Sequence, residues 1–231
     1  MTRASTSKQA PRASQQARGQ ARIEAILQAA AAMAAEGGVA AVTMHLVAKR
    51  AQTSVGSMYH FFPDRESLLQ ILVERHMAAV RQINEQLIAV PAEVWQSMST
   101  AATIEHLVGP FIEHINRHPD FLAVMHGRDT AEGDADFMRT FRHVLGARLP
   151  GITAAALEDY VAVMHAIAAG GMHVGFQSNP HRADLYLREV PRALAAYLAR
   201  LEADHGLAKS GSDRAHGPSR IPGTGSGKQG H

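Results

Sequence analysis

The sequence has no cysteine, few aromatic residues and no long apolar run, and each absence excludes a kind of protein. Without cysteine, the 231-residue chain has no disulfides, thiolate metal ligands or cysteine nucleophiles. No segment approaches the roughly 18 continuous apolar residues of a transmembrane helix, so no membrane partner is expected. The chain also lacks a P-loop and the G-x-S-x-G and G-x-G-x-x-G motifs, so these signatures do not indicate an enzyme.

Alanine, in contrast, is abundant, with 41 residues, while aromatic residues make up only 5%. Alanine has the best helix propensity, and the apolar residues recur at helical spacing without strand alternation. The sequence therefore predicts an all-α fold of about nine or ten helices. Breaks or kinks are expected at Gly109–Pro110 and Pro191, and residues 128–134 are expected to form a loop. The expected helices span residues 20–36, 44–51, 55–62, 64–90, 100–117, 119–127, 135–149, 152–176 and 184–203.

Both ends of the chain are polar. Residues 1–19 carry four basic residues and no acid, and residues 206–231 are rich in Gly, Ser and Pro. Neither segment can bury enough apolar surface to offset its ordering entropy, so both are expected to be disordered. The N-terminus lacks the apolar core of a signal peptide, although an Arg- and Ser-rich transit peptide remains an alternative. The expected location is cytoplasmic.

The net charge of +2 conceals an uneven distribution along the chain. Residues 1–76 hold nine basic and five acidic residues, a net charge of +4, whereas residues 77–205 hold ten and fifteen, a net charge of −5. Residues 206–231 have a net charge of +3. A basic front segment on an acidic body indicates that the front meets a polyanion, although a chance partition of charge remains an alternative.

Two short helices with a tight turn between them follow an initial supporting helix, as in a helix-turn-helix. The second helix begins with the small residues Ser54–Ser57, which allow close approach to DNA, and its N-terminal N–H groups favour phosphate. Tyr59 and His60 add longer side chains. A three-helix cap without DNA contacts is the alternative.

The segment VTMHLVAKRAQTSVGSMYHFFPDRESLL, residues 42–69, resembles the DNA-binding domain of the TetR/AcrR family of bacterial regulators. The resemblance covers roughly residues 20–75. Two positions depart from the family pattern: Gln52 replaces the usual Gly, and Arg65 replaces the usual Lys. If residue 52 is left-handed, Gln costs about 1 kcal/mol relative to Gly.

The resemblance implies a homodimer that binds a palindromic operator in double-stranded DNA, usually repressing transcription when no small-molecule effector is bound. Between the two tails expected from composition, a disordered basic one (1–19) and a C-terminal one (206–231), it implies a DNA-binding domain (20–66) and a ligand-binding and dimerisation domain (67–205). The basic tail either adds DNA contacts or stays solvated. The DNA contacts that it implies are Thr43, Ser54, Val55, Gly56, Ser57, Tyr59, His60 and Arg65.

The effector is expected to be an apolar or aromatic small molecule, because aromatic and Met side chains recur through the C-terminal helices. Two histidines are candidate polar anchors. The ligand-binding candidates are Trp95, Phe111, His114, Phe121, Met125, Phe141, Met164, His165 and Met172. The resemblance implies that the last two long helices form the dimer's four-helix bundle. Their alanine and glycine residues permit the close approach that this needs, although an intramolecular core explains part of the pattern.

Fourteen histidines raise the possibility of a metal site. His114 and His118 have i,i+4 spacing, but His118 precedes Pro119 at an expected helix end, and no HExxH motif occurs. Structural or surface histidines are the favoured interpretation, and neither a metal nor another cofactor is predicted. The alternatives to a ligand-responsive repressor are an architectural or protein-binding relative without small-molecule control and a metal-dependent enzyme.

Overall fold

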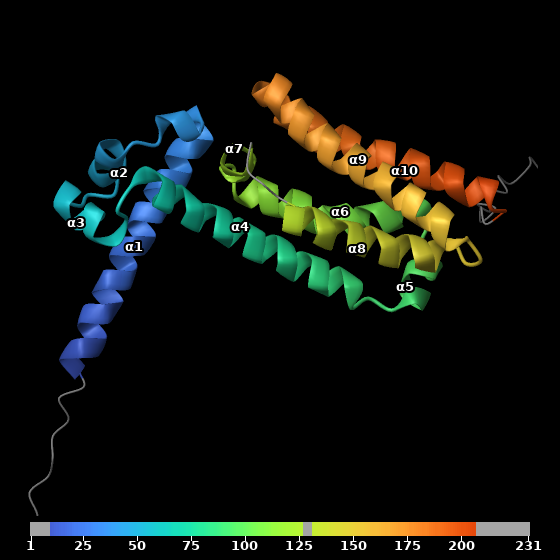
Figure 1. Cartoon of the computed structure of the whole chain (residues 1–231), viewed down its shortest axis with the longest axis horizontal. Helices are drawn as coiled ribbons and strands as arrows, with labels where there is room; N and C mark the ends of the chain where they lie inside the picture. Colours follow the sequence, from blue (N-terminus) through green and yellow to red (C-terminus); the bar gives the residue numbers. More distant parts are fainter. Residues whose placement is uncertain (1–9, 127–130, 207–231) are drawn as a thin grey trace, which may run out of the picture.

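The chain folds into helices in a computed structural model, which describes residues 10–126 and 131–206. Figure 1 shows a small helical head, a long connecting helix and a body of stacked helices. Within the described ranges there are ten α-helices and two 3₁₀-helices. They are α1 (Ala10–Gly37), η1 (Val39–Ala41), α2 (Met44–Arg50), α3 (Val55–Phe61), α4 (Arg65–Ile88), α5 (Ala92–Ser97), α6 (Thr100–Arg117), α7 (Phe121–Met125), α8 (Ala131–Arg148), α9 (Ala154–Ser178), η2 (Pro180–Arg182) and α10 (Ala183–Asp204).

Two apolar cores meet along α4. The N-terminal half of α4 packs with α1, α2 and α3 around Leu27, Val47 and Met58, all at most 1% exposed. Its C-terminal end contributes Leu87 to the second core, which α5, α6, α8, α9 and α10 share. The 24-residue helix is about 36 Å long, so it physically links the head to the body. The predicted domain boundary at residue 66 therefore falls within a continuous helix.

Helices α9 and α10 pack very closely through glycine. A Cβ added at Gly175 would lie 2.7 Å from the Tyr186 ring, and one at Gly171 would lie 2.5 Å from Val190 Cγ2. Any larger side chain would push α10 away, so glycine sets the spacing of this helix pair. The two helices lie together along one side of the body in Figure 1.

Arg148 connects three helical elements at one end of the body. It forms a buried ion pair with Glu202 of α10, and its Nη1 donates to the backbone oxygens of Trp95 (2.9 Å) and Met98 (2.6 Å). Thr100 donates to the same Glu202 carboxylate. One buried guanidinium thus joins α8, α10 and the end of α5.

Several helix ends and breaks differ from the sequence-based expectations. Helix α1 begins at Ala10, not near Gln20, because its early turns are rich in helix-favouring Ala, Gln and Arg although they lack an apolar stripe. Helix α8 begins at Ala131, inside the predicted loop at 128–134. Helices α6 and α10 are unbroken, with Pro110 and Pro191 inside them. A proline removes one N–H donor, but the packing of both helices outweighs that loss. The predicted disorder of residues 1–9 and 207–231 falls outside the described residues.

None of the helices in the described ranges is both long enough and apolar enough to cross a membrane.

Candidate DNA-binding surface and ligand cavity

In the helix-turn-helix, side-chain hydrogen bonds cap the start of α2 and of α3, and a backbone hydrogen bond spans the turn between them. The Thr43 side chain caps α2, and Ser54 Oγ caps α3 by accepting a hydrogen bond from Ser57 N at 3.1 Å. Between the helices, Thr53 N donates to Ala48 O at 3.0 Å, and Gln52 has a φ of 51°. Gln52 is therefore left-handed, the conformation in which Gln is less stable than Gly.

Helix α3 has a buried face and an exposed face. Met58 is fully buried in the N-terminal core, whereas Tyr59 is 46% exposed and Val55 is 36% exposed. A Cβ at Gly56 would meet nothing within 4 Å, so the protein itself does not require glycine there. The structure thus places Val55, Gly56, Tyr59 and the exposed His60 on the solvent side, where a groove of DNA can be contacted.

Arg22 of α1 also reaches this surface, which the sequence did not reveal. Its Nη1 donates to Ser57 Oγ at 3.2 Å, so a guanidinium lies against the first turn of α3. Position 22 lies on the polar side of α1 and belongs to no motif. Only the crossing of α1 and α3 in space makes it a candidate phosphate ligand.

The other basic side chains of the head differ in what they contact. Arg65 Nη2 donates to the carbonyl oxygen of Val39 at 2.5 Å, so this residue connects the start of α4 to η1. Arg50 forms a bidentate pair with Glu36, both contacts at 2.6 Å, and that hydrogen-bonded pairing lowers the pKa of Glu36. The charge of Arg50 is therefore balanced within the protein, whereas Arg22 bonds to a neutral hydroxyl.

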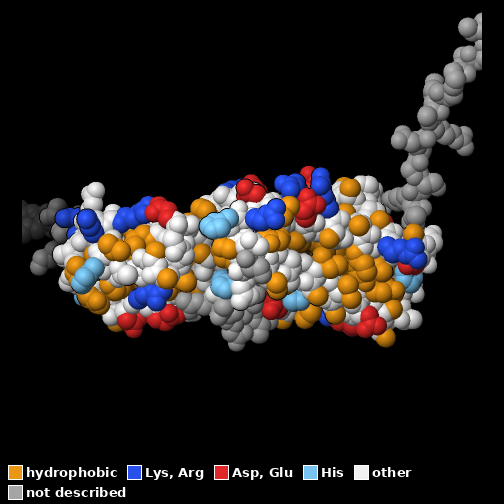
Figure 2. All heavy atoms as spheres, turned by 90° about the horizontal axis from the view of Figure 1, so that it is seen from above, with side chains coloured by type: hydrophobic (Ala, Val, Ile, Leu, Met, Phe, Trp, Pro, Cys, Tyr) orange, Lys and Arg blue, Asp and Glu red, His pale blue; other side chains and the backbone are white. Residues whose placement is uncertain are grey.

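The surface of the body carries an apolar area over α9 and α10. Figure 2 shows hydrophobic side chains gathered on the half of the molecule where these helices lie. Val163 and Val174 of α9 are 42% and 57% exposed, and Ala162, Ala166 and Ala196 are also exposed. We call these five residues the α9–α10 face. Such a face is unfavourable in water for a single copy.

A cavity of about 500 Å³ lies inside the body. Met77 and Val80 of α4 form one side, and side chains from α6 to α10 form the rest. A volume of this size is typical of sites for drug-sized ligands. The aromatic lining residues are Phe111, Phe121, Phe137 and Phe176, and Phe111 meets Phe137 edge to face with ring centroids 5.0 Å apart.

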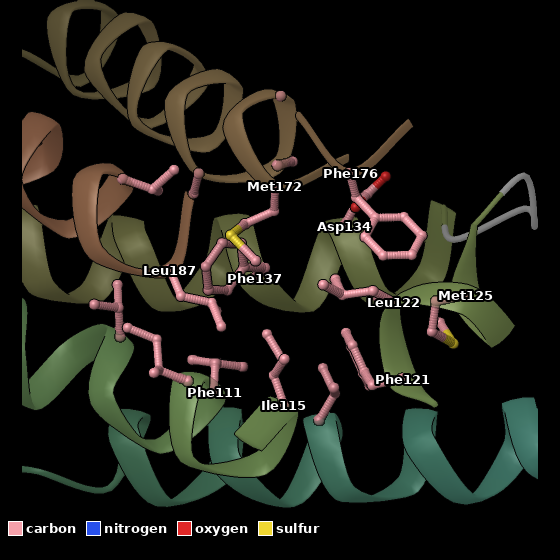
Figure 3. A pocket seen from close by; sticks show the side chains of 18 of the residues that line it. Phe111, Ile115, Phe121, Leu122, Met125, Asp134, Phe137, Met172, Phe176 and Leu187 are labelled. Carbon is pink, nitrogen blue, oxygen red and sulfur yellow. The ribbon is translucent and has the colours of Figure 1, made fainter. Parts of the chain in front are cut away.

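Only some of the predicted ligand-binding residues line this cavity. Four of them do: Phe111, Phe121, Met125 and Met172 (Figure 3). Three belong to the packed second core and are fully buried there: Trp95, Phe141 and Met164. His165 is not a lining residue, although its Nε2 lies 3.4 Å from Asp134 Oδ1, and His114 lines a second pocket. Sequence reasoning did not identify Met77 and Asp134 as lining residues, because their helices are far apart in the chain.

A chain of histidines joins α4 to α6 and α7. His76, only 5% exposed, has its Nε2 2.9 Å from Asp120 Oδ2 and its Nδ1 3.2 Å from His114 Nε2. A carboxylate can only accept, so His76 Nε2 carries a proton, and in the neutral ring Nδ1 then accepts from His114. The ring of His118 lies 4.6 Å from that of His114, measured between centroids.

The charges within this cluster follow from its burial. Burial, together with the neighbouring His118 and His76, lowers the pKa of His114 to about 4. Burial raises the pKa of Asp120, but the hydrogen bond from His76, the charge interactions with His76 and His118 and a backbone hydrogen bond together lower the pKa overall. At neutral pH, His114 is thus uncharged beside an ionised Asp120. The described residues contain no group of three or more His, Asp or Glu side chains arranged to hold a metal ion.

These observations define a class of protein, a helix-turn-helix head that one continuous helix connects to a helical body with an apolar cavity. Residues 26–72 match the family model of bacterial regulatory proteins of the TetR family, and residues 99–198 match that of the tetracyclin repressor-like C-terminal domain. The chain belongs to the TetR family of DNA-binding transcriptional regulators. No curated protein matches it significantly.

Solved structures share the fold at low sequence identity. A TetR-family transcriptional regulator from Streptomyces coelicolor is 20% identical, with a TM-score of 0.53, and the match covers 79% of this chain and 98% of that one. SmeT, solved in complex with triclosan, is 22% identical, with a TM-score of 0.57, and the match covers 88% of this chain and 100% of that one.

Proposed function

We propose that this regulator is a homodimeric, ligand-responsive repressor that binds a palindromic operator and releases it when a small molecule occupies the cavity. The observation that carries the proposal is the double role of α4. Its residues Leu68 and Leu69 pack in the same core as Met58 of α3, and Met77, two turns further on, lines the cavity.

This arrangement supports coupling between the two sites. A ligand that displaces Met77 or Val80 acts on the helix that also supports the head. Any change in the direction of α4 then alters the position of α3. A ligand shifts such an equilibrium only by its difference in affinity for the two arrangements. The capture of triclosan by SmeT supports, by analogy of fold, an aromatic occupant for a body of this kind.

The operator contacts that we propose are exposed or half-buried residues of α3 and its flanks. They are Thr43, Ser54, Val55, Gly56, Ser57, Tyr59, His60 and Arg65, to which the structure adds Arg22. Two heads of a symmetric dimer would read two half-sites about one helical turn of DNA apart, or a multiple of it.

Selection of bound fragments from a pool of random genomic DNA tests this proposal. We expect enrichment of a palindrome whose half-sites are separated by about 10 base pairs or a multiple of this spacing. Recovery of fragments without a shared sequence would instead support the architectural alternative. Failure to recover any DNA above the level of a control protein would contradict DNA binding.

Substitution of Tyr59 tests the reading surface on the selected operator. We expect Tyr59→Ala to weaken operator binding about tenfold, because a lost base or phosphate contact costs about 1–3 kcal/mol. Val94→Ala trims a side chain of similar exposure, 39% against 46%, on the distant α5 and is the matched control. Equal operator affinities for the two variants, measured by fluorescence anisotropy, would remove Tyr59 from the interface.

A further inference from the structure

The first turns of α1 extend beyond the core of the head. The buried residues that α1 contributes to this core begin at Ile26, whereas the helix itself begins at Ala10. Figure 1 shows the early turns running past α3 and away from the body. The stretch from Ala10 to Arg22 is about 20 Å long, and the side chains at positions 15–18 and 20–22 are exposed. These turns therefore lie outside the apolar core.

One side of α1 changes in chemical character where the helix leaves the head. Residues three or four positions apart share a helix face, and one such line runs through Gln15, Arg18, Arg22, Ile26, Ala29 and Met33. The last three of these residues are buried in the head, whereas the first three are exposed. The side of α1 that packs in the apolar core thus continues outside it as a polar and basic side. We call Gln15, Arg18 and Arg22 the α1 basic face.

A printed contact places this face beside the reading helix. Arg22 Nη1 donates to Ser57 Oγ at 3.2 Å, and Ser57 lies in the first turn of α3, which Ser54 caps. The α1 basic face therefore begins next to the end of α3 that we propose contacts DNA, and it runs outward from there. Duplex DNA continues beyond the bases that a helix reads, with its phosphates as closely spaced as within the half-site.

The charge of this part of the chain is complementary to DNA. Residues 1–23 contain five basic residues and no acidic residue. The first acid along the chain is Glu24, whose carboxylate accepts two hydrogen bonds from Arg75, at 3.0 and 2.7 Å. The negative charge nearest to the basic face in sequence is thus already paired. Arginine side chains on an exposed face are typical of contacts to phosphate.

Building on the proposed operator binding, we infer that the α1 basic face binds the sugar–phosphate backbone of the duplex that flanks each half-site. The contact is independent of base sequence, because phosphates are the same at every position. A helix segment of about 20 Å matches about six base pairs of duplex at 3.4 Å each. The dimer therefore covers up to that much DNA beyond each end of the palindrome.

Operator duplexes of two lengths test this inference with the full-length protein. One contains the selected palindrome alone, and the other adds about ten base pairs at each end, in two unrelated flank sequences. Fluorescence anisotropy gives both affinities between about 50 and 200 mM salt, the range over which phosphate contacts weaken steeply. We expect the flanked duplex to bind about tenfold more tightly, with a steeper salt dependence and with the same affinity for either flank sequence.

Two glutamines of α1 give a matched pair of variants. Gln15 lies on the basic face, whereas Gln20, which is also exposed, lies about 140° away around the helix. Gln15→Lys should strengthen binding of the flanked duplex and steepen its salt dependence by about two phosphate contacts per dimer, and Gln15→Glu should weaken binding. The same two changes at Gln20 alter the net charge equally and should have much smaller effects. Circular dichroism establishes that all four variants fold.

The outcomes separate this inference from the proposed function. Equal affinity for the short and flanked duplexes, or equal effects at Gln15 and Gln20, would overturn the flank contact while leaving operator recognition intact. An affinity that depends on the flank sequence would show that bases are read there, which also contradicts a phosphate contact. If neither duplex is preferred over a scrambled duplex of the same length, the proposed operator binding fails, and the flank contact fails with it.

Discussion

At the scale of single residues, Gln52 adopts a backbone conformation in the turn of the helix-turn-helix that is unfavourable for any residue other than glycine. Its φ of 51° lies in the region where a Cβ is unfavourable. The departure from the family's usual glycine is therefore a real cost in the folded state. The turn survives because Thr53 N still bonds to Ala48 O and because Met58 buries its side chain just beyond it.

We expect Gln52→Gly to raise the free energy of unfolding by up to about 1 kcal/mol, since glycine adopts this conformation without strain. Part of that gain is lost because glycine also increases the entropy of the unfolded chain. Gln52→Ala is the control, because alanine keeps the Cβ. Urea unfolding that gives glycine no advantage over alanine would show that the left-handed geometry carries no measurable strain.

Arg148 and Glu202 form an ion pair that is almost fully buried. The Arg148 guanidinium and the Glu202 carboxylate are 6% and 5% exposed, so removing one charge leaves the other buried without its partner. We expect Arg148→Met to lower the free energy of unfolding by about 3–5 kcal/mol. Adding Glu202→Leu should recover much of this loss. If the double variant is as unstable as the single variant, the lost contacts to the α5 backbone, not the orphaned carboxylate, dominate.

At the scale of elements, helix type was largely predictable from sequence, but helix ends and side-chain neighbours were not. Thr43, Ser54 and Asp64 cap α2, α3 and α4, and residue type alone indicates such caps because an N-cap is a local interaction. The start of α1 was wrong by ten residues, because its first turns have helix propensity but no apolar face. Pro110 and Pro191 do not break α6 and α10, because tertiary packing outweighs the loss of one N–H donor.

The candidate site shows the same division between local and long-range information. The exposed face of α3 follows from one short segment and was predictable. The cavity brings together helices separated by up to a hundred residues, so the large apolar side chains that line it resemble those of the core. Trp95 and Phe141 were misplaced for this reason. Asp134 and Arg22 gain their significance only from what lies beside them in space.

The histidine chain between α4, α6 and α7 predicts how these elements respond to acid. In the unfolded chain His114 protonates near pH 6.5, but in the folded protein its pKa is about 4. Above pH 6.5 the residue is neutral in both states and contributes nothing to the pH dependence. Between these values only the unfolded state gains the proton, so the free energy of unfolding should fall as the pH drops. The lowered pKa of Asp120 acts in the same direction at still lower pH.

Urea unfolding between pH 7.5 and 4 measures this effect. His114→Gln removes the titrating group and should flatten the profile in this range. His106→Gln, at an exposed histidine on the same helix, should leave it unchanged. Parallel profiles for wild type and His114→Gln would place the acid sensitivity elsewhere.

At the scale of the whole molecule, the basic and acidic segments of the sequence correspond to different parts of the structure. The segment with net charge +4 includes the head and the start of α4, and the segment with net charge −5 forms the body. DNA is therefore attracted to the head and repelled by the body, which orients the approach.

The α9–α10 face predicts the oligomeric state, since small side chains let two helices from each copy form a four-helix bundle. We expect light scattering to give twice the 24.8 kDa of one chain. Val163→Arg puts a charge into the proposed interface and should yield the mass of a single chain. Val94→Arg, at a valine of similar exposure on α5, 39% against 42%, should remain dimeric. Because a palindrome needs two linked heads, the monomeric variant should also lose operator affinity by at least tenfold. A dimeric Val163→Arg variant with full operator affinity would place the interface on another surface of the body.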